Sequence, residues 1–151
     1  MTCPKCESAL KIIQVGLHPP VIGTGTVGFI SLEVAQCESC AGIWFKEGTL
    51  ERYLREHGDR LPETPMLPSR LREFDEKLAN CPACKKAMDK DFVRTRPEVR
   101  VDHCEDCGGY WLDDGEIQRL TEAGKPGDAL LTDARSRLER ILGGWLPLAR
   151  H

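Results

Sequence analysis

The sequence of 151 residues has few aromatic side chains and no long apolar segment. Aromatic residues make up 6% of the chain and charged residues 30%, which leaves little bulky apolar material for one large core. The longest stretch without Asp, Glu, Lys or Arg is residues 12–32, and Gly, Pro, Thr, Gln and His interrupt it. A membrane-spanning helix needs about 20 predominantly apolar residues. We therefore expect a soluble protein built from small units.

The sequence shows no pattern typical of a secretory signal and no strong charge of one sign. Its first residues, "MTCPKCESAL", contain no basic leader followed by an apolar segment and a small-residue cleavage site. We therefore expect a reducing, cytoplasmic environment, in which paired cysteines are more often metal ligands than disulfides. The net charge is −3, with both signs mixed along the chain. No global field favours nucleic acid as a partner.

Cysteine is abundant, and its spacing reveals an internal duplication. All eight cysteines stand in C-x-x-C pairs, and the pattern CPxC followed by CxxC-x-G-x-W occurs twice. "CEDCGGYWLDDGEI" at residues 104–117 is the stronger copy, and "CESCAGIWFKEGTL" at residues 37–50 is the weaker one. Such a repeat predicts two small units, each of which needs a metal to supplement its core.

The cysteines predict two four-cysteine metal sites. Two C-x-x-C turns, carried on a hairpin and a following loop, complete a tetrahedral thiolate shell for Zn²⁺. The two C-x-x-C pairs are separated by 19 intervening residues in the second unit and by 30 in the first. Pairing within a unit costs less loop-closure entropy than pairing between units. Iron would fit the same all-sulfur shell, and buried thiols, disulfides or a redox pair would also use paired cysteines. The predicted ligands are Cys3, Cys6, Cys37 and Cys40 in one site and Cys81, Cys84, Cys104 and Cys107 in the other.

Local patterns predict the elements around each site. Val99 and Val101 alternate with polar residues and favour a β-hairpin in the second unit. Asp113 and Glu116 fit a capping box at the start of a helix that Gly124 ends. The predicted organisation is a first unit with an enlarged hairpin over residues 1–57, a Pro-rich linker with a short helix over 58–80, a second unit over 81–124, and an amphipathic C-terminal helix with a tail over 125–151.

The order CPxC, CxxC-x-G-x-W, an acidic residue and Gly-Glu resembles the bacterial zinc-ribbon family named after the zinc finger of transcription factor IIB. The resemblance covers about residues 1–57 and 81–124, and the first copy departs from the pattern at Phe45, Lys46 and Thr49. It implies a small α+β fold of two tandem rubredoxin-like zinc ribbons, each with a hairpin, a four-cysteine zinc site and a short helix. It also implies a loose association with transcription or protein assembly.

The favoured function is a non-catalytic zinc-binding interaction module that serves as an accessory to a transcription or assembly complex. No nucleophile with a base, no open metal shell and no phosphate loop indicates an enzyme. One alternative is a nucleic-acid-binding zinc ribbon, with a basic face on the second hairpin. A second is a rubredoxin-like iron electron carrier. The residues of the basic face are Lys86, Lys90, Arg94 and Arg96.

The uncharged segment 12–32 predicts a partner surface. Its water-facing side lacks the usual charged residues, and contiguous apolar surface commonly marks an interface. We expect its tip to bind another protein or a second copy of this chain, whereas the alternative is that it packs on the second unit or the C-terminal helix. The tip residues are Val21, Ile22, Val27 and Phe29.

Overall fold

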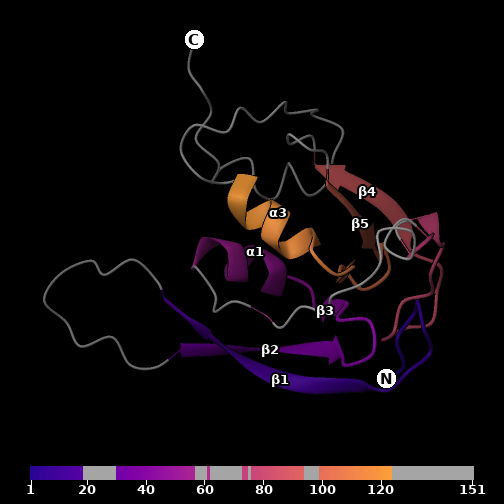
Figure 1. Cartoon of the computed structure of the whole chain (residues 1–151), viewed down its shortest axis with the longest axis horizontal. Helices are drawn as coiled ribbons and strands as arrows, with labels where there is room; N and C mark the ends of the chain where they lie inside the picture. The colour runs from indigo at the N-terminus through magenta and orange to yellow at the C-terminus, as the bar shows by residue number, and fades with distance from the viewer. Residues whose placement is uncertain (19–29, 57–60, 62–72, 75, 94–98, 124–151) are drawn as a thin grey trace, which may run out of the picture.

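The fold was analysed in a computed structural model that describes residues 1–18, 30–56, 61, 73–74, 76–93 and 99–123 (Figure 1). The predicted C-terminal amphipathic helix and the tip of the uncharged segment lie outside these residues. The strands are β1 (Leu10–Leu17), β2 (Ile30–Cys37), β3 (Ile43–Phe45), β4 (Asp89–Val93), β5 (Val99–His103) and β6 (Tyr110–Leu112). Helix α1 (Thr49–Arg55) follows β3, and helix α3 (Glu116–Ala123) follows β6.

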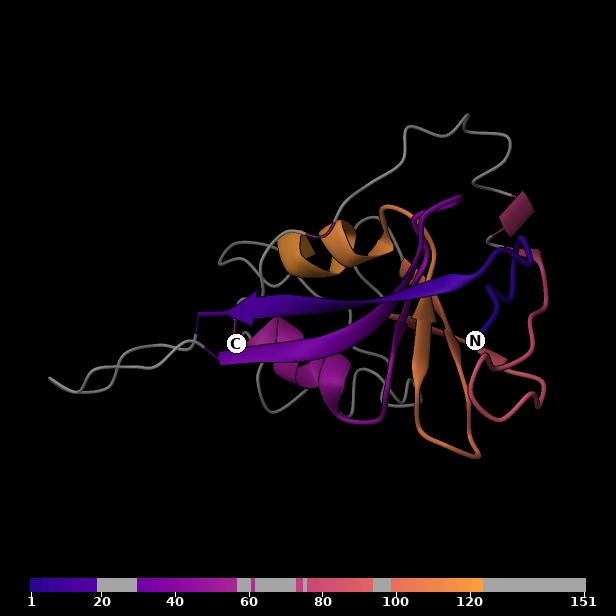
Figure 2. The ribbon, with the colours of Figure 1, turned by 90° about the horizontal axis from the view of Figure 1, so that it is seen from below.

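Both ribbons contribute to one antiparallel sheet with the strand order β1-β2-β3-β6-β5-β4. The first ribbon supplies β1 to β3 and the second supplies β4 to β6. Each ribbon places its first strand at an edge of the sheet and its third strand at the centre, so the two halves of the sheet are arranged symmetrically. The sheet is strongly twisted, as Figure 2 shows, where the long β1 and β2 run across the direction of the orange strands of the second ribbon. The two ribbons therefore form one continuous sheet rather than two separate domains.

A hairpin forms the outer part of each half of the sheet, and the alternating pattern predicted the hairpin of the second ribbon. In the first ribbon, β1 pairs with β2 from Leu10 opposite Cys37 to Leu17 opposite Ile30. In the second, β4 pairs with β5 over five residues of each strand. Both hairpins lead directly to a cysteine pair, because Cys37 ends β2 and Cys104 follows β5.

The pairing of β3 with β6 joins the two ribbons at the centre of the sheet. Trp44 lies opposite Trp111, with Ile43 opposite Leu112 on one side of this pair and Phe45 opposite Tyr110 on the other. Because Trp44 and Trp111 occupy the same position in the two repeats, an approximate twofold axis passes between them. Both indoles are almost completely buried.

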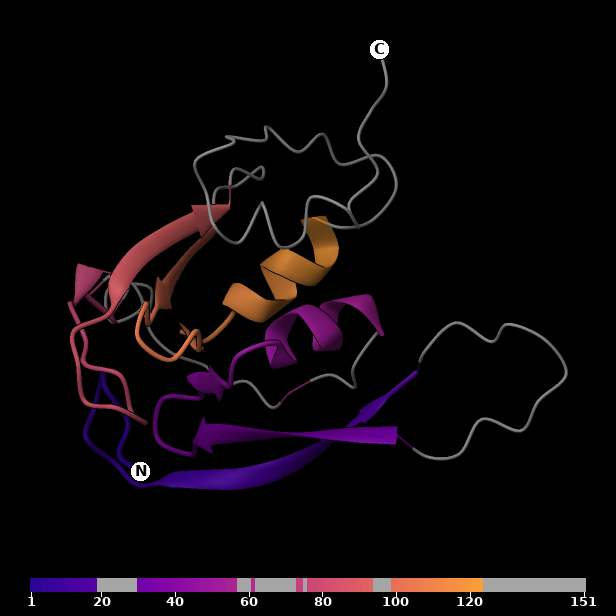
Figure 3. The same cartoon turned by 180° about the vertical axis from the view of Figure 1, so that it is seen from behind.

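Alternation along these central strands creates two different faces of the sheet. On one face, apolar side chains from β3 and β6 pack with the buried sides of α1 and α3, and the two helices lie side by side (Figures 1 and 3). On the other face, Trp44 and Trp111 pack with Met88, Phe74 and the cysteines of both ribbons. The helices thus cover one side of the sheet, and the candidate metal sites lie on the other.

A glycine in each ribbon makes room for the tryptophan of the other ribbon. A Cβ atom on Gly42 would lie 2.2 Å from Cζ2 of Trp111, and a Cβ atom on Gly109 would lie 2.2 Å from Cζ2 of Trp44. Atoms cannot approach so closely, so only glycine fits either position. The glycine and tryptophan of the C-x-x-C-x-G-x-W pattern therefore serve the contact between ribbons.

The residues that contact the start of each helix differ between the two ribbons. Thr49 begins α1 without a side-chain cap, after Gly48 in the left-handed conformation. In the second ribbon, the Glu116 carboxylate accepts a hydrogen bond of 2.8 Å from the backbone N–H of Asp113, which is the glutamate half of the predicted capping box. The described part of α3 runs to Ala123, and the predicted stop at Gly124 lies outside the described residues. No helix in the part of the chain that the structure describes is long and apolar enough to cross a membrane.

The acidic residues at the start of α3 are buried. The Asp113 carboxylate accepts a hydrogen bond of 2.9 Å from the Trp111 indole N–H, so this bond joins Asp113 to the core rather than to the helix. Burial, together with the charge of Asp113, raises the pKa of Glu116 well above its ordinary value. Glu116 therefore loses its proton at a higher pH in the folded protein than in the unfolded chain.

We predict that Gly109→Ala lowers the free energy of unfolding by about 1–3 kcal/mol or more, because the new methyl group collides with the Trp44 indole. In a Trp44→Leu background, the same substitution should cost less, and the cost that remains comes from the Phe45 carbonyl oxygen, 2.9 Å from the new Cβ atom. Urea unfolding of the four proteins measures this cycle. As a control, Gly48→Ala meets open space at a positive φ, so its cost should be the same in both backgrounds. Equal costs of Gly109→Ala in both backgrounds would contradict the packing argument.

We predict that Glu116→Gln stabilises the protein increasingly as the pH rises. The raised folded pKa means that the unfolded chain loses this proton first, so wild-type stability falls between the ordinary glutamate pKa of about 4.3 and the raised value. Glutamine does not ionise and still offers an acceptor to the Asp113 N–H. Melting temperatures measured side by side across this range test the sign, with Glu76→Gln, at an exposed position, as control. If the melting temperature of Glu116→Gln relative to wild type falls as the pH rises, the prediction is wrong.

Candidate metal centres

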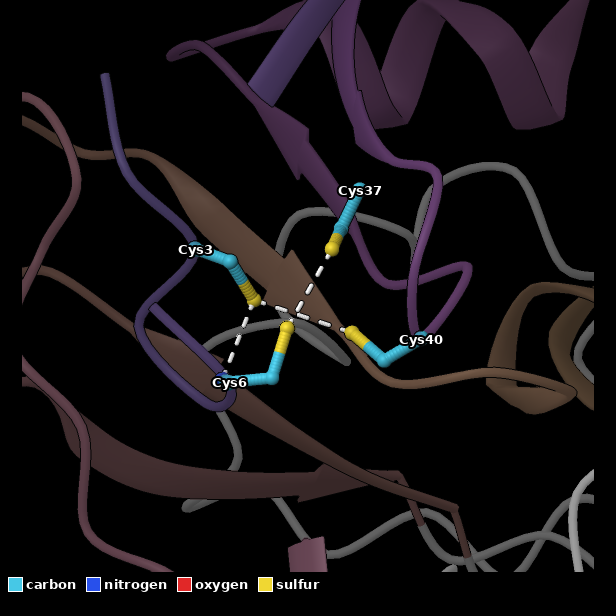
Figure 4. Close-up of side chains that lie close together, drawn as sticks. All are labelled: Cys3, Cys6, Cys37 and Cys40. Carbon is cyan, nitrogen blue, oxygen red and sulfur yellow. Dashed lines mark hydrogen bonds between the residues drawn. The ribbon is translucent and has the colours of Figure 1, made fainter. Parts of the chain in front are cut away.

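The structure gathers the eight cysteines into the two predicted groups. In each group, the four sulfur atoms lie within 4.8 Å of one another. Figure 4 shows the first group, in which the side chains converge on a common centre. Two of its members come from the N-terminal loop before β1, and the other two come from the end of β2 and the turn after it. The members are Cys3, Cys6, Cys37 and Cys40, and the second group is Cys81, Cys84, Cys104 and Cys107.

Each C-x-x-C pair lies in a tight turn, which we call a knuckle, and all four knuckles have the same backbone pattern. The residue after the second cysteine donates its N–H to the carbonyl of the first cysteine, at distances of 2.8–3.0 Å. That residue always has a positive φ, between 56° and 69°. A left-handed residue is easy for glycine but strained for others. The residues concerned are Glu7, Ala41, Lys85 and Gly108.

Backbone N–H groups in the first knuckle of each ribbon point at a sulfur. Lys5 and Cys6 both donate to the Cys3 sulfur at 3.4 Å. In the second ribbon, the N–H groups of Ala83 and Cys84 lie 3.3 and 3.4 Å from the Cys81 sulfur. Donors in this position stabilise a negative sulfur. The knuckles are therefore built to hold thiolates.

The sulfur separations fit a tetrahedral metal shell. In the first group, the contacts Cys3–Cys40 and Cys6–Cys37 measure 3.6 and 3.4 Å. The corresponding contacts in the second group measure the same 3.6 and 3.4 Å. A tetrahedron with Zn–S bonds of about 2.3 Å has edges of about 3.8 Å, whereas a disulfide bond is about 2.05 Å long. All eight cysteines are free, and each group suits one tetrahedral cation.

The electrostatics of each group also call for a cation. Burial raises the pKa of Cys37 and Cys104, and it raises the pKa of Cys81 to about 12. In the Cys3–Cys40 contact, the hydrogen bond raises the pKa of Cys40 and lowers that of Cys3 to about 5, so the pair keeps one proton. Four thiolates can share this space only when a positive ion neutralises them.

A buried lysine lies between the two groups, and the sequence did not reveal it. Lys5 belongs to the first knuckle, yet its side chain is fully buried and its ammonium group lies 2.8 Å from Asp102 and 3.3 Å from Asp113 of the second ribbon. Lys90 Nζ lies 2.9 Å from the other oxygen of Asp102. A lysine between two metal ligands is ordinarily exposed, and only the repeat comparison, in which Ala83 takes its place, distinguishes it.

The structure places only part of the predicted basic face. Lys86 pairs with Asp106 at 2.7 Å, and Lys90 pairs with the buried Asp102. Arg94 and Arg96 lie outside the described residues. The two described lysines are therefore already matched to carboxylates of their own ribbon.

The comparisons with known proteins agree with this geometry. Residues 80–123 match the family described as transcription factor zinc-finger. No curated protein and no solved structure matches the chain. The matched segment contains all four cysteines of the second group, its hairpin and α3, and the first ribbon repeats the cysteine arrangement outside the match. Residues 80–123 thus match the transcription factor zinc-finger family, and a second four-cysteine site in the same chain supports a tandem pair of such units.

Proposed function

We propose that this chain is a non-catalytic interaction module, in which two structural zinc ions stabilise a surface that a protein partner binds. The observation that carries the proposal is the pair of complete four-sulfur groups. Four thiolates fill a tetrahedral shell and leave no position for water or a substrate, which is typical of structural zinc. Bound zinc would supply the positive charge that the buried thiolates lack. The family of the second ribbon favours an accessory role in a transcription or assembly complex.

The family match also favours zinc over iron. A rubredoxin-like iron site would use the same tetrahedral sulfur shell, so the distances alone do not separate the two metals. Iron thiolate sites are coloured, whereas zinc sites are not. Metal analysis of protein purified without added metal therefore distinguishes the interaction module from an electron carrier.

Structural roles account for the acidic residues that follow the second site. Asp113 binds the Trp111 indole and faces Lys5, and Glu116 binds the backbone at the start of α3. Both carboxylates are buried. These contacts support the non-catalytic assignment, because they explain the two acids without a substrate.

We expect two zinc ions per chain in the purified protein. At saturating zinc, Cys40→Ser and Cys107→Ser should each retain one ion, because each removes a ligand from a different group. Thiolate sites contribute about 10 kcal/mol or more of apparent binding free energy, so chelation should unfold the wild type. Elemental analysis and circular dichroism measure both effects. Ser39→Ala, in the same knuckle as Cys40, is the control that should keep two ions. Full structure in metal-free protein would defeat the proposal.

The partner surface at the tip of the uncharged segment stays a prediction, because its residues lie outside those that the structure describes. We expect the double substitution Ile22→Asp and Phe29→Asp to keep both zinc ions and the melting temperature while abolishing binding to the partner or self-association. Light scattering and affinity capture from the native cell measure these two effects. Leu78→Asp, at a side chain that is already 76% exposed, is the matched control. Unfolding of the double variant would instead identify the tip as core.

A further inference from the structure

Lys5 connects the backbone of the first metal site to the interior of the second ribbon. It stands between the ligands Cys3 and Cys6, and its own N–H donates to the Cys3 sulfur at 3.4 Å. The position of its backbone therefore depends on the folded first knuckle. The loops that carry the first knuckles of both ribbons lie side by side (Figures 1 and 3), so the lysine side chain needs to cross only a short distance.

The side chain of Lys5 ends among carboxylates of the second ribbon. Its ammonium group lies 2.8 Å from Asp102, two residues before the ligand Cys104, and 3.3 Å from Asp113, which follows β6. Burial lowers the pKa of Lys5, but attraction to Asp113 and Asp102 outweighs burial and raises it, so the ammonium stays charged. Lys90 also contacts Asp102, at 2.9 Å. Among the described residues, Lys5 is the cation that pairs with Asp113.

The same ammonium group holds the chain segment that leads into the second metal site. It donates to the carbonyl of Phe74 at 2.6 Å and to that of Lys77 at 3.0 Å. In return, the Lys77 ammonium donates to the carbonyl of Lys5 at 2.6 Å. Phe74 packs in the core cluster that contains the cysteines of both groups. Lys5 therefore fixes both Asp102 beside Cys104 and the segment that precedes Cys81.

The sequence repeat does not duplicate this link. The counterparts of Lys5, Asp102 and Asp113 are Ala83, Ala35 and Lys46. Removal of one partner from a buried ion pair is strongly unfavourable, because it leaves an uncompensated charge inside the protein. Opening of the first knuckle would withdraw Lys5 and leave Asp113 as a buried charge without its cation. Disorder around the second site would in turn leave the buried Lys5 ammonium without its two carboxylates.

We propose that Lys5 couples the two metal sites energetically, so that a metal ion in either site raises the affinity of the other. The proposal rests on the two-metal function above. The first site orders the backbone of Lys5, and the second site orders its carboxylates, so each ion stabilises the same buried contact. Coupling between binding sites is reciprocal, and each metal therefore changes the affinity for the other by the same factor.

Cadmium-113 NMR tests the coupling, because each four-cysteine site gives its own signal. Cys3→Ser with Cys6→Ser removes the first site, and the signal that remains identifies the second. A competing chelator is then titrated into cadmium-loaded protein with and without the first site. We expect loss of the first site to lower cadmium affinity at the second by at least tenfold. The triple variant Lys5→Met, Asp102→Asn, Asp113→Asn removes the buried charges together, and in this background the loss should be less than threefold.

Several outcomes separate a role of Lys5 from competing explanations. In the control variant Lys11→Met, which removes an exposed lysine of the same ribbon, the tenfold loss should persist. If removal of the first site lowers cadmium affinity at the second equally with and without Lys5, Asp102 and Asp113, the sheet carries the coupling. If it does not lower that affinity in the wild-type background, the two sites are independent. Either result overturns the role of Lys5 while leaving the two-metal function intact. A single cadmium signal in the wild type would overturn that function itself.

Discussion

The pairing of β3 with β6 is the interaction on which the rest of the molecule depends. Each of these strands has three residues, yet their antiparallel contact turns two small hairpins into one sheet. Trp44 fits over Gly109, and Trp111 fits over Gly42. Since close packing requires each cavity to be filled, neither ribbon completes its own core without the other. A ribbon of this size has little apolar area to bury, and the shared sheet supplies what each half lacks.

Polar groups around this symmetric centre differ between the two halves. The Trp111 indole donates to Asp113, whereas the buried Trp44 indole N–H has no acceptor within the described part of the chain. Lys46 stands where the second ribbon has Asp113, and it turns outward to Glu33. The second ribbon thus holds the buried carboxylates, and the first ribbon supplies their cation, Lys5. This division makes the halves complementary, so the duplicated chain is more than two copies of one unit.

Local sequence patterns predicted the parts of this fold but not their connection. The cysteine grouping and the second hairpin follow from spacing and alternation within each ribbon. The contact between ribbons does not, because the short runs at Ile43–Phe45 and Tyr110–Leu112 are apolar throughout and carry no signal of a pairing partner. The burial of Lys5 depends on Asp102 in the other ribbon, and no local pattern reports a contact between residues so distant in the sequence. The spatial role of the glycines was hidden for the same reason.

The knuckles explain why a metal ion belongs to the core of this protein. Residues other than glycine adopt the left-handed conformation at Glu7, Ala41 and Lys85, at a cost of about 1–2 kcal/mol each. Strain of this kind persists only where the surrounding structure enforces it. Burial opposes ionisation of Cys81 and Cys104, so the sulfur atoms do not enforce the turns by themselves. On the proposed zinc binding, the ion offsets both costs at once. Both groups of cysteines pack in one cluster with tryptophan and phenylalanine side chains, so the metal sites are part of the core rather than attachments to its surface.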